Sequence, residues 1–81
     1  MKVKLLFFAQ LKDFIQAPEL VLELAGPLSC REASDTLGRQ YPGAGSILDQ
    51  CAVARNGLLV PENAMLEDGD ELALLPPVSG G

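Results

Sequence analysis

The chain has 81 residues, with eleven acidic and six basic side chains that give a formal net charge of -5. This length fits one domain, near the lower limit for a fold held by a single hydrophobic core, and the acidic balance argues against nucleic-acid binding, which depends on clustered Lys and Arg. The absence of His excludes Ser-His-Asp and Cys-His catalysis and histidine-ligated metal sites within this chain, and no run approaches the roughly 18 apolar residues that span a membrane.

Residues 2–8 are predicted to form the first strand, because apolar and charged side chains alternate along them. One face, predicted to be core, carries Val3, Leu5 and Phe7, and the other carries Lys2, Lys4, Leu6 and Phe8. The apolar stretch is too short for the hydrophobic region of a signal peptide and lacks a small-residue cleavage site. We therefore expect a cytoplasmic protein.

A short helical turn anchored by Leu11 and Phe14 is predicted before Pro18. Alternation over residues 20–24 then predicts a second strand, close enough in sequence to pair with the first as a hairpin.

The main helix is predicted to begin near Cys30, because Ser29 and Glu32 have the spacing of a capping box, in which each side chain satisfies a free backbone N–H. Its inward stripe has the three- and four-residue spacing of one helix face and comprises Cys30, Ala33, Leu37 and Tyr41. Pro42-Gly43 is predicted to end it.

A loop carrying Ile47 and Leu48 is predicted next, followed by two short strands over 51–55 and 58–60 around Asn56-Gly57, the residue pair best suited to a type I′ hairpin turn. A turn-rich connection over 61–70 leads to a last strand, in which Leu72 and Leu74 alternate with Ala73 and Leu75.

This order of elements predicts an α+β fold, a mixed sheet of about five strands with one main helix packed across it. The order is that of the ubiquitin-like β-grasp fold, in which the first and last strands lie side by side and parallel. We assign residues 1–75 to this domain and residues 76–81 to a flexible, extended C-terminal tail.

The C-terminal tail begins with two prolines, which restrict the backbone, and ends with two glycines, which carry no side chain. Pro76 and Pro77 fix φ near -65° and cannot donate ladder hydrogen bonds, so the strand ends there. Beyond Val78 and Ser79, Gly80 and Gly81 lack a Cβ, so the backbone can thread a channel too narrow for side chains. A frayed terminus is the alternative interpretation, but a Pro-Pro pair placed just before two terminal glycines favours a functional tail.

The α-carboxylate of Gly81 is the predicted reactive group, because no side chain blocks attack on its carbonyl carbon. Activation as an acyl-adenylate, followed by attack of a sulfur nucleophile, would leave a thiocarboxylate. We expect the chain to bind no cofactor, with ATP used by an activating enzyme, and no metal, since the acidic segment 67–71 lacks EF-hand spacing. Cys30 and Cys51 form no C-x-x-C pair and are predicted to be buried, inert thiols.

An exposed apolar patch is predicted beside the start of the tail. If the first and last strands are neighbours, Leu6, Phe8 and Leu75 lie together on the face that the core does not use. Such a patch commonly marks a contact with a partner. The alternative is that a loop covers these residues.

Three segments carry a family resemblance: Leu-Phe-Phe-Ala-Gln-Leu at 6–11, Asp-Gly-Asp-Glu at 68–71, and Pro-Pro-Val-Ser-Gly-Gly at 76–81. Together they resemble the MoaD-like small subunit of molybdopterin synthase, a sulfur carrier of the ubiquitin-like β-grasp superfamily. The resemblance spans the chain in length and element order. Members of that family commonly have aromatic residues before the two prolines, where this chain has Leu74-Leu75.

The resemblance implies a reaction cycle. An E1-like, MoeB-type enzyme adenylates Gly81 with ATP, and sulfur delivery then forms the thiocarboxylate. The tail inserts into a large MoaE-like subunit, within a heterotetramer of two small and two large subunits. There the sulfur passes to cyclic pyranopterin monophosphate and builds the dithiolene of molybdopterin. The functional residue carried over is Gly81, with Gly80 its channel-fitting neighbour, and the catalytic groups are expected on the large subunit.

Three rival hypotheses remain at this point. One is a ThiS-like sulfur carrier for thiazole, although the Phe-Phe-Ala and Pro-Pro-Val-Ser-Gly-Gly segments favour the pterin branch. Another is a ubiquitin-like modifier joined through Gly81 to lysines of target proteins. The third is a plain interaction module whose tail has no role.

Overall fold

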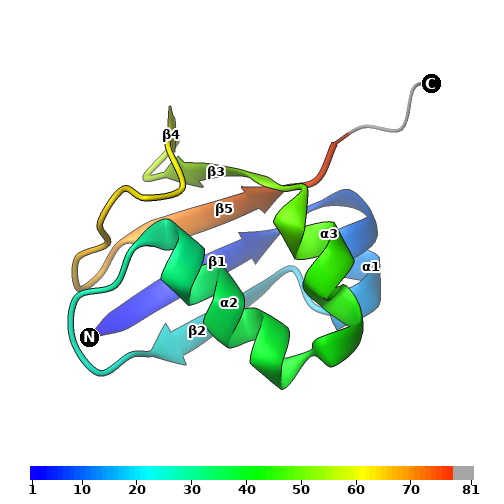
Figure 1. Ribbon diagram of the computed structural model, residues 1–81, viewed down its shortest axis with the longest axis horizontal. Helices are drawn as coiled ribbons and strands as arrows, with labels where there is room; N and C mark the ends of the chain where they lie inside the picture. Colours follow the sequence, from blue (N-terminus) through cyan, green and yellow to red (C-terminus); the bar gives the residue numbers. More distant parts are fainter. Residues whose placement is uncertain (78–81) are drawn as a thin grey trace.

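The alternating segments of the sequence form one five-stranded sheet in the computed structural model, which describes residues 1–77 (Figure 1). The strands are β1 (Lys2–Phe7), β2 (Glu19–Glu23), β3 (Ala52–Arg55), β4 (Leu58–Val60) and β5 (Glu71–Leu75). Their order in the sheet is β2-β1-β5-β3-β4. The tail residues Val78, Ser79, Gly80 and Gly81, to which the sequence assigns the chemistry, lie outside the described residues.

The first and last strands lie side by side in the middle of the sheet. β1 and β5 are parallel, with Leu5 opposite Leu72 and Phe7 opposite Leu74, whereas the other strand pairs are antiparallel. All four of these side chains are buried. The predicted β-grasp arrangement, with neighbouring parallel end strands, is therefore confirmed.

The main helix α2 (Cys30–Gln40) crosses one face of the sheet (Figure 1). Its capping box is present: the Glu32 backbone N–H donates to Ser29 Oγ at 3.1 Å, and the Ser29 N–H donates to Glu32 Oε1 at 3.0 Å. The predicted inward residues Cys30, Ala33 and Leu37 are completely buried. Tyr41 follows the last helical residue and is half-buried.

The connection over residues 61–70 completes the start of α2. The first N–H groups of a helix have no partner within the helix; here the N–H of Cys30 donates to the Ala64 carbonyl at 2.8 Å and that of Arg31 to the Glu62 carbonyl at 2.7 Å. The turn-rich segment therefore holds the helix against the sheet.

The short predicted turn around Leu11 is a helix, α1 (Ala9–Ile15), and only one of its two proposed anchors is in the core. Leu11 is completely buried, whereas Phe14 is 46% exposed. The Phe14 ring instead lies against the backbone of Gly43, where an added Cβ would come within 2.5 Å of Phe14 Cζ. The absence of a side chain at Gly43 thus makes room for the ring.

The predicted loop around Ile47 and Leu48 is wrong, because these residues lie in a further helix, α3 (Gly45–Asp49), which follows the 3-10 turn η1 (Pro42–Ala44). Leu48 is buried, and a Cβ placed on Gly38 of α2 would lie 3.5 Å from Leu48 Cδ1. Packing against the bare Gly38 segment of α2 therefore stabilises a helix too short to show a periodic pattern. In the described residues no helix is long and apolar enough to cross a membrane.

The Asn56-Gly57 turn is a type I′ turn as predicted, with φ of 50° at Asn56 and 86° at Gly57. Asn56 also joins the turn to the start of β5. Its Nδ2 donates to Asp70 Oδ1 at 2.9 Å, and its Oδ1 accepts the Glu71 N–H at 2.9 Å. The Asp70 carboxylate also accepts the Glu67 N–H at 2.8 Å, so the acidic turn is ordered by its own hydrogen bonds.

These bonds predict an acid-sensitive contribution to stability. The Asn56 amide, followed by the Glu67 N–H, lowers the pKa of Asp70. The folded state therefore favours the carboxylate, and its contribution is present above the ordinary pKa of about 3.9 and is lost as the pH falls through the lowered folded value. We expect Asp70→Asn to lower the free energy of unfolding at pH 7, with a difference from wild type that shrinks below about pH 4.

Urea denaturation across this pH range measures the difference. Asp13→Asn, at an exposed position of α1, is the control for general loss of negative charge. A penalty for Asp70→Asn that stays constant down to the acid limit would contradict the assignment.

Candidate functional site

The described chain ends where the tail leaves the sheet. β5 stops at Leu75, Pro76 is still buried, and Pro77 is exposed. Prolines cannot donate to a strand ladder, which explains the end of β5. The exposed chain therefore starts at Pro77, at the end of the sheet opposite the N-terminus (Figure 1).

The base of the tail is held from both sides. Leu74 lies opposite Phe7 of β1 and Val53 of β3, and Leu75 lies opposite Ala52. An edge strand would have one such neighbour, whereas β5 has two and is fixed in direction by both. A partner that captures the tail would thus find its starting point in a defined position relative to the domain.

The face of the sheet turned away from α2 carries an apolar band. Leu6 lies opposite Ala73, Ala73 opposite Ala54, and Ala54 opposite Leu59, so these side chains point to one side. Leu75 and Ala52 form a second opposed pair on the same side. We call this set the apolar open face: Leu6, Ala52, Ala54, Leu59, Ala73 and Leu75. Leu6, Ala73 and Leu75 are half-buried, whereas Leu59 is 72% exposed.

The predicted patch of Leu6, Phe8 and Leu75 is part of a wider surface. β1 ends one residue earlier than predicted, at Phe7, because the chain turns at Ala9 with a φ of 51°. Phe8 nevertheless keeps extended angles (φ -133°, ψ 158°), which continue the alternation, so its 44% exposed side chain points to the side of Leu6.

Sequence reasoning missed the part of the apolar open face on β3 and β4. The signal was present, since Ala52 and Ala54 alternate with Val53 and Leu59 follows Leu58. It could be used only once the register placed these strands beyond β5. Leu59 then lies on the same side as Leu6.

Charged side chains occupy most of the rest of this face, around the exposed Val21. Over β1 and β2, Lys2 Nζ lies 3.7 Å from Glu23 Oε1 and Lys4 Nζ lies 3.5 Å from Glu19 Oε2. All four side chains are at least 46% exposed, so these ion pairs add little to stability. They mark a boundary between the apolar open face and the β2 edge.

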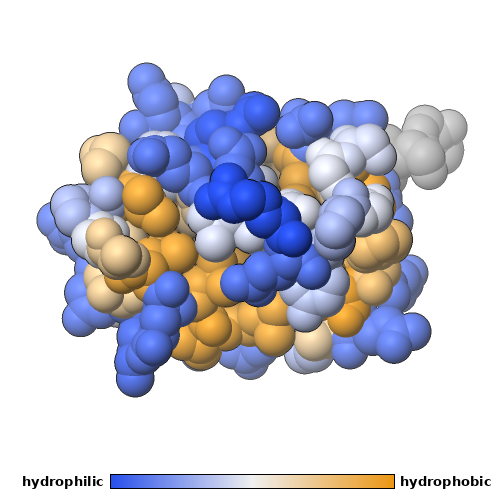
Figure 2. Space-filling view, turned by 60° about the horizontal axis from the view of Figure 1, so that its bottom comes forward, coloured by the Kyte–Doolittle hydropathy of each residue, from blue (hydrophilic) through white to orange (hydrophobic). Residues whose placement is uncertain are grey.

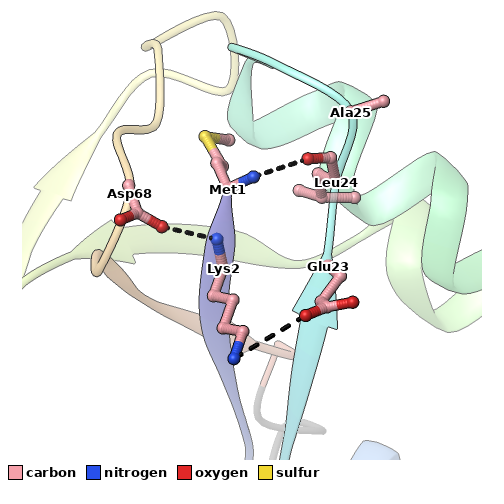
Figure 3. Close-up of a pocket in the computed structure, with 6 residues that line it drawn as sticks. All are labelled: Met1, Lys2, Glu23, Leu24, Ala25 and Asp68. Atoms are coloured by element: carbon pink, nitrogen blue, oxygen red, sulfur yellow. Dashed lines mark hydrogen bonds and ion pairs between the residues drawn. The ribbon is translucent and has the colours of Figure 1, made fainter.

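A shallow hollow at the N-terminal end also contains charged groups, and several of its polar atoms are already paired (Figure 3). The Met1 ammonium donates to the Leu24 carbonyl at 2.8 Å. The Lys2 N–H donates to Asp68 Oδ1 at 2.7 Å, and the Lys2 side chain reaches Glu23. These contacts join β1 to β2 and to the 61–70 connection, which is a structural role.

The two thiols are protonated at neutral pH. Burial raises the pKa of Cys30, which is completely buried in α2. Burial also raises the pKa of Cys51 to about 11. The half-buried Cys51 Sγ lies 3.3 Å from the Ile47 carbonyl and donates to it. Neither thiol has the thiolate character that a sulfur-transferring cysteine needs. The predicted burial is confirmed for Cys30, whereas Cys51 is only half-buried.

Comparisons with known proteins agree with this geometry. In fold, the chain is a ubiquitin-like β-grasp protein: it superimposes on SAMP1 from Haloferax volcanii with a TM-score of 0.88, at 29% identity and over 100% of both chains. The match to the ThiS family covers residues 5–81, and the chain belongs to that family.

Two further proteins are similar over the full length. The molybdopterin synthase sulfur carrier subunit of Chlamydomonas reinhardtii is 30% identical over 83 aligned positions, covering 100% of both chains. A structure of the complex of subunits 1 and 2 of the molybdopterin-converting factor from Helicobacter pylori contains a chain that is 30% identical, with a TM-score of 0.70 and 100% coverage of both chains.

The raised pKa of Cys51 predicts slow alkylation. With a pKa of about 11, its thiolate fraction at pH 8 is far below that of an ordinary thiol with a pKa near 8.5. We expect iodoacetamide to modify the folded protein much more slowly than it modifies glutathione at pH 8, measured by intact mass. Cys51→Ser identifies the modified site. Alkylation of the folded protein as fast as that of glutathione at pH 8 would contradict the assignment.

Proposed function

We propose that this chain is the sulfur-carrier small subunit of a molybdopterin synthase and carries sulfur as a thiocarboxylate on Gly81. The observation that carries the proposal is the junction of β5 and the tail: a doubly paired central strand leads directly into Pro-Pro-Val-Ser-Gly-Gly, next to an apolar face. Full-length relatives named as sulfur carrier subunits support it.

The proposed chemistry has two steps at the Gly81 carboxylate. One carboxylate oxygen attacks the α-phosphorus of ATP and displaces pyrophosphate, giving the acyl-adenylate. Hydrosulfide then attacks the carbonyl carbon and the bond to AMP breaks, which gives the thiocarboxylate directly; a persulfide donor would give an acyl disulfide, whose S–S bond a thiol reductant must then cleave. The E1-like, MoeB-type enzyme uses ATP and supplies the catalytic groups, and the chain itself binds no cofactor. We expect ATP and the activating enzyme in the cytoplasm, and we therefore place the cycle there.

The next step of the proposal is transfer on a large MoaE-like subunit. The tail enters that subunit, Gly80 and Gly81 pass its narrow part because they lack a Cβ, and the sulfur goes to cyclic pyranopterin monophosphate. Val78 and Ser79 complete the threaded segment beyond Pro76 and Pro77. The large subunit holds the groups that catalyse transfer, and two copies of each subunit form the heterotetramer.

The apolar open face is the proposed contact with the large subunit. It lies on the strand that leads into the tail, and an apolar surface of this kind is typical of a partner interface. Leu6, Phe8 and Leu75, which the sequence singles out, lie at its tail end, and Leu59 lies toward the free edge of β4.

A ubiquitin-like modifier is the second candidate, because SAMP1 shares the fold over the full chain. The SAMP1 of Methanosarcina acetivorans is called a small archaeal modifier protein. A ThiS-like carrier for thiazole is the third, through the family itself. High-mass conjugates in a lysate, lost on deletion of Gly80 and Gly81, would favour the modifier. If the same deletion abolishes only thiazole synthesis, the thiazole carrier is favoured. If the deletion has no effect, an interaction module is favoured.

The first experiment is the intact mass of the protein after incubation with ATP, a MoeB-type enzyme and a sulfur donor. We expect one oxygen to be replaced by sulfur, and tandem fragmentation to place the change on Gly81. The matched control is the chain lacking Gly81, which should gain nothing. An unchanged mass with an enzyme that activates another carrier would contradict sulfur carriage.

Leu58 and Leu59 offer a matched pair for the interface. Each is 72% exposed, but adjacent residues of a strand point to opposite faces, and only Leu59 is on the apolar open face. We expect Leu59→Asp to weaken binding to the large subunit by tenfold or more, about the loss seen when one interface anchor is removed.

Leu58→Asp should leave this affinity nearly unchanged. Calorimetric titration of each variant against the large subunit measures the effect, and circular dichroism confirms folding. Equal losses for the two variants would contradict the assignment of the face.

A further inference from the structure

We propose that the free edge of β2 binds an extended segment of a partner protein, in which basic residues flank an apolar centre, by adding a strand to the sheet. The site is separate from the apolar open face and from the tail. It stands whether or not the chain is a sulfur carrier.

The backbone of β2 presents a regular row of groups at the edge of the sheet. Met1 and Leu24 exchange both backbone hydrogen bonds, each at 2.8 Å, on the side of β1. Bonded pairs alternate along an antiparallel ladder, so Leu22 and Leu20 also face β1. The N–H and C=O groups of Glu19, Val21 and Glu23 therefore point away from β1.

Within residues 1–77, β2 has β1 as its single strand neighbour. Among the same residues, no backbone hydrogen bond between elements uses the outward groups of Val21. Addition of an extended peptide to such an edge is a recurrent recognition mode, in which main-chain bonds supply affinity and alternating side chains supply specificity.

The side chains on the open-face side of this edge determine the charge of the segment. Val21 is 58% exposed and lies between Glu19 and Glu23. Their partners Lys4 and Lys2 are on β1, one strand farther from the edge. Strands lie roughly 4.8 Å apart, so a new strand has the carboxylates as its direct neighbours and the lysines as its second neighbours. Basic side chains opposite the glutamates and an apolar one opposite Val21 fit this row.

The side of the edge that faces the helix layer is apolar. Figure 2, with the bottom of the Figure 1 view turned forward, shows hydrophobic side chains gathered from the left to below the centre of this side, beneath a hydrophilic group at the centre. Leu20 of β2 and Leu28, which precedes α2, are half-buried and pack against the core cluster that contains the buried Leu22 and Leu24. The alternate side chains of an added strand would meet this surface, so they too should be apolar.

The same charges disfavour a second copy of this chain. An antiparallel pairing of two β2 strands centred on Val21 places Glu19 of one copy opposite Glu23 of the other. Like charges directly opposite each other are destabilising. Exposed acidic side chains are also a common protection of edge strands against self-association. The edge therefore rejects itself and fits a basic segment.

A segment on β2 would leave the tail accessible. β1 lies between β2 and β5, and the end of β5 is on the far side of β1 from the proposed site (Figure 1). A protein bound at β2 could hold the domain while a second protein works on the tail.

The test uses a synthetic acetylated peptide, Gly-Lys-Ile-Val-Ile-Lys-Gly amide, titrated into the full-length, isotope-labelled protein. We expect amide shift changes centred on residues 19–24 and slower hydrogen exchange of the Val21 N–H. A control peptide with Glu in place of both Lys should bind more weakly. Equal binding of the two peptides, or shift changes confined to β4 and β5, would overturn the proposal.

Two variants sharpen the test. Glu23→Lys should weaken binding of the Lys peptide by roughly threefold to tenfold and strengthen binding of the Glu peptide, as expected for reversing one cross-strand charge pair. Val21→Pro should abolish binding, because it removes an outward N–H without removing a bond to β1. Circular dichroism checks that both variants are folded. If Val21→Pro unfolds, the opposite effects of Glu23→Lys on the Lys and Glu peptides decide the test.

Retained binding by folded Val21→Pro would overturn strand addition. A dimer with a protected Val21 amide in the absence of peptide would assign the edge to a second copy of the chain and would also overturn the proposal.

Discussion

The parallel pairing of β1 with β5 is the contact on which the rest of this structure depends. It joins the two ends of the domain through buried pairs such as Leu5 with Leu72, and it places both strands at the centre of the sheet. Parallel neighbours require a long crossover, and here the crossover supplies α2 and the β3–β4 hairpin. The tail base, the apolar open face and the free β2 edge all have their positions because this one pairing fixes the strand order.

The domain separates its possible contacts by position. The tail leaves from the centre of the sheet, the apolar open face runs from the end of β1 over β5, β3 and β4, and the charged edge lies at β2. Some polar groups elsewhere are used in internal contacts: Arg31 pairs with Asp35 at 3.1 Å, and the Met1 ammonium donates to the Leu24 carbonyl. Such a division suits a small carrier that must meet more than one protein, because each partner can use a surface that the other leaves free.

Much of this fold follows from local patterns, and the exceptions have physical reasons. The capping box at Ser29, the Asn56-Gly57 turn and the alternation of Val3, Leu5 and Phe7 each act within a few residues, so the sequence displays them directly. The helix α3 has five residues and begins at Gly45; it depends on packing, which no local pattern reveals. The faces of β3 and β4 became readable only with the register. The chemistry assigned to Gly81 came from the tail sequence alone and stays a prediction.

The Asn56 side chain is a site of slow chemical change, because it can lose its amide nitrogen. Asn followed by Gly is the pair most prone to lose its amide nitrogen, since no side chain hinders attack by the next backbone nitrogen, and asparagine is among the thermolabile residues. Here the amide donates to Asp70 at 2.9 Å. Once hydrolysed, it would become a second carboxylate facing the first, and an attraction would turn into a repulsion. The hydrogen bonds that join the β3–β4 turn to the start of β5 would then weaken. Deamidated molecules would therefore differ from intact ones at the start of the strand that leads into the tail.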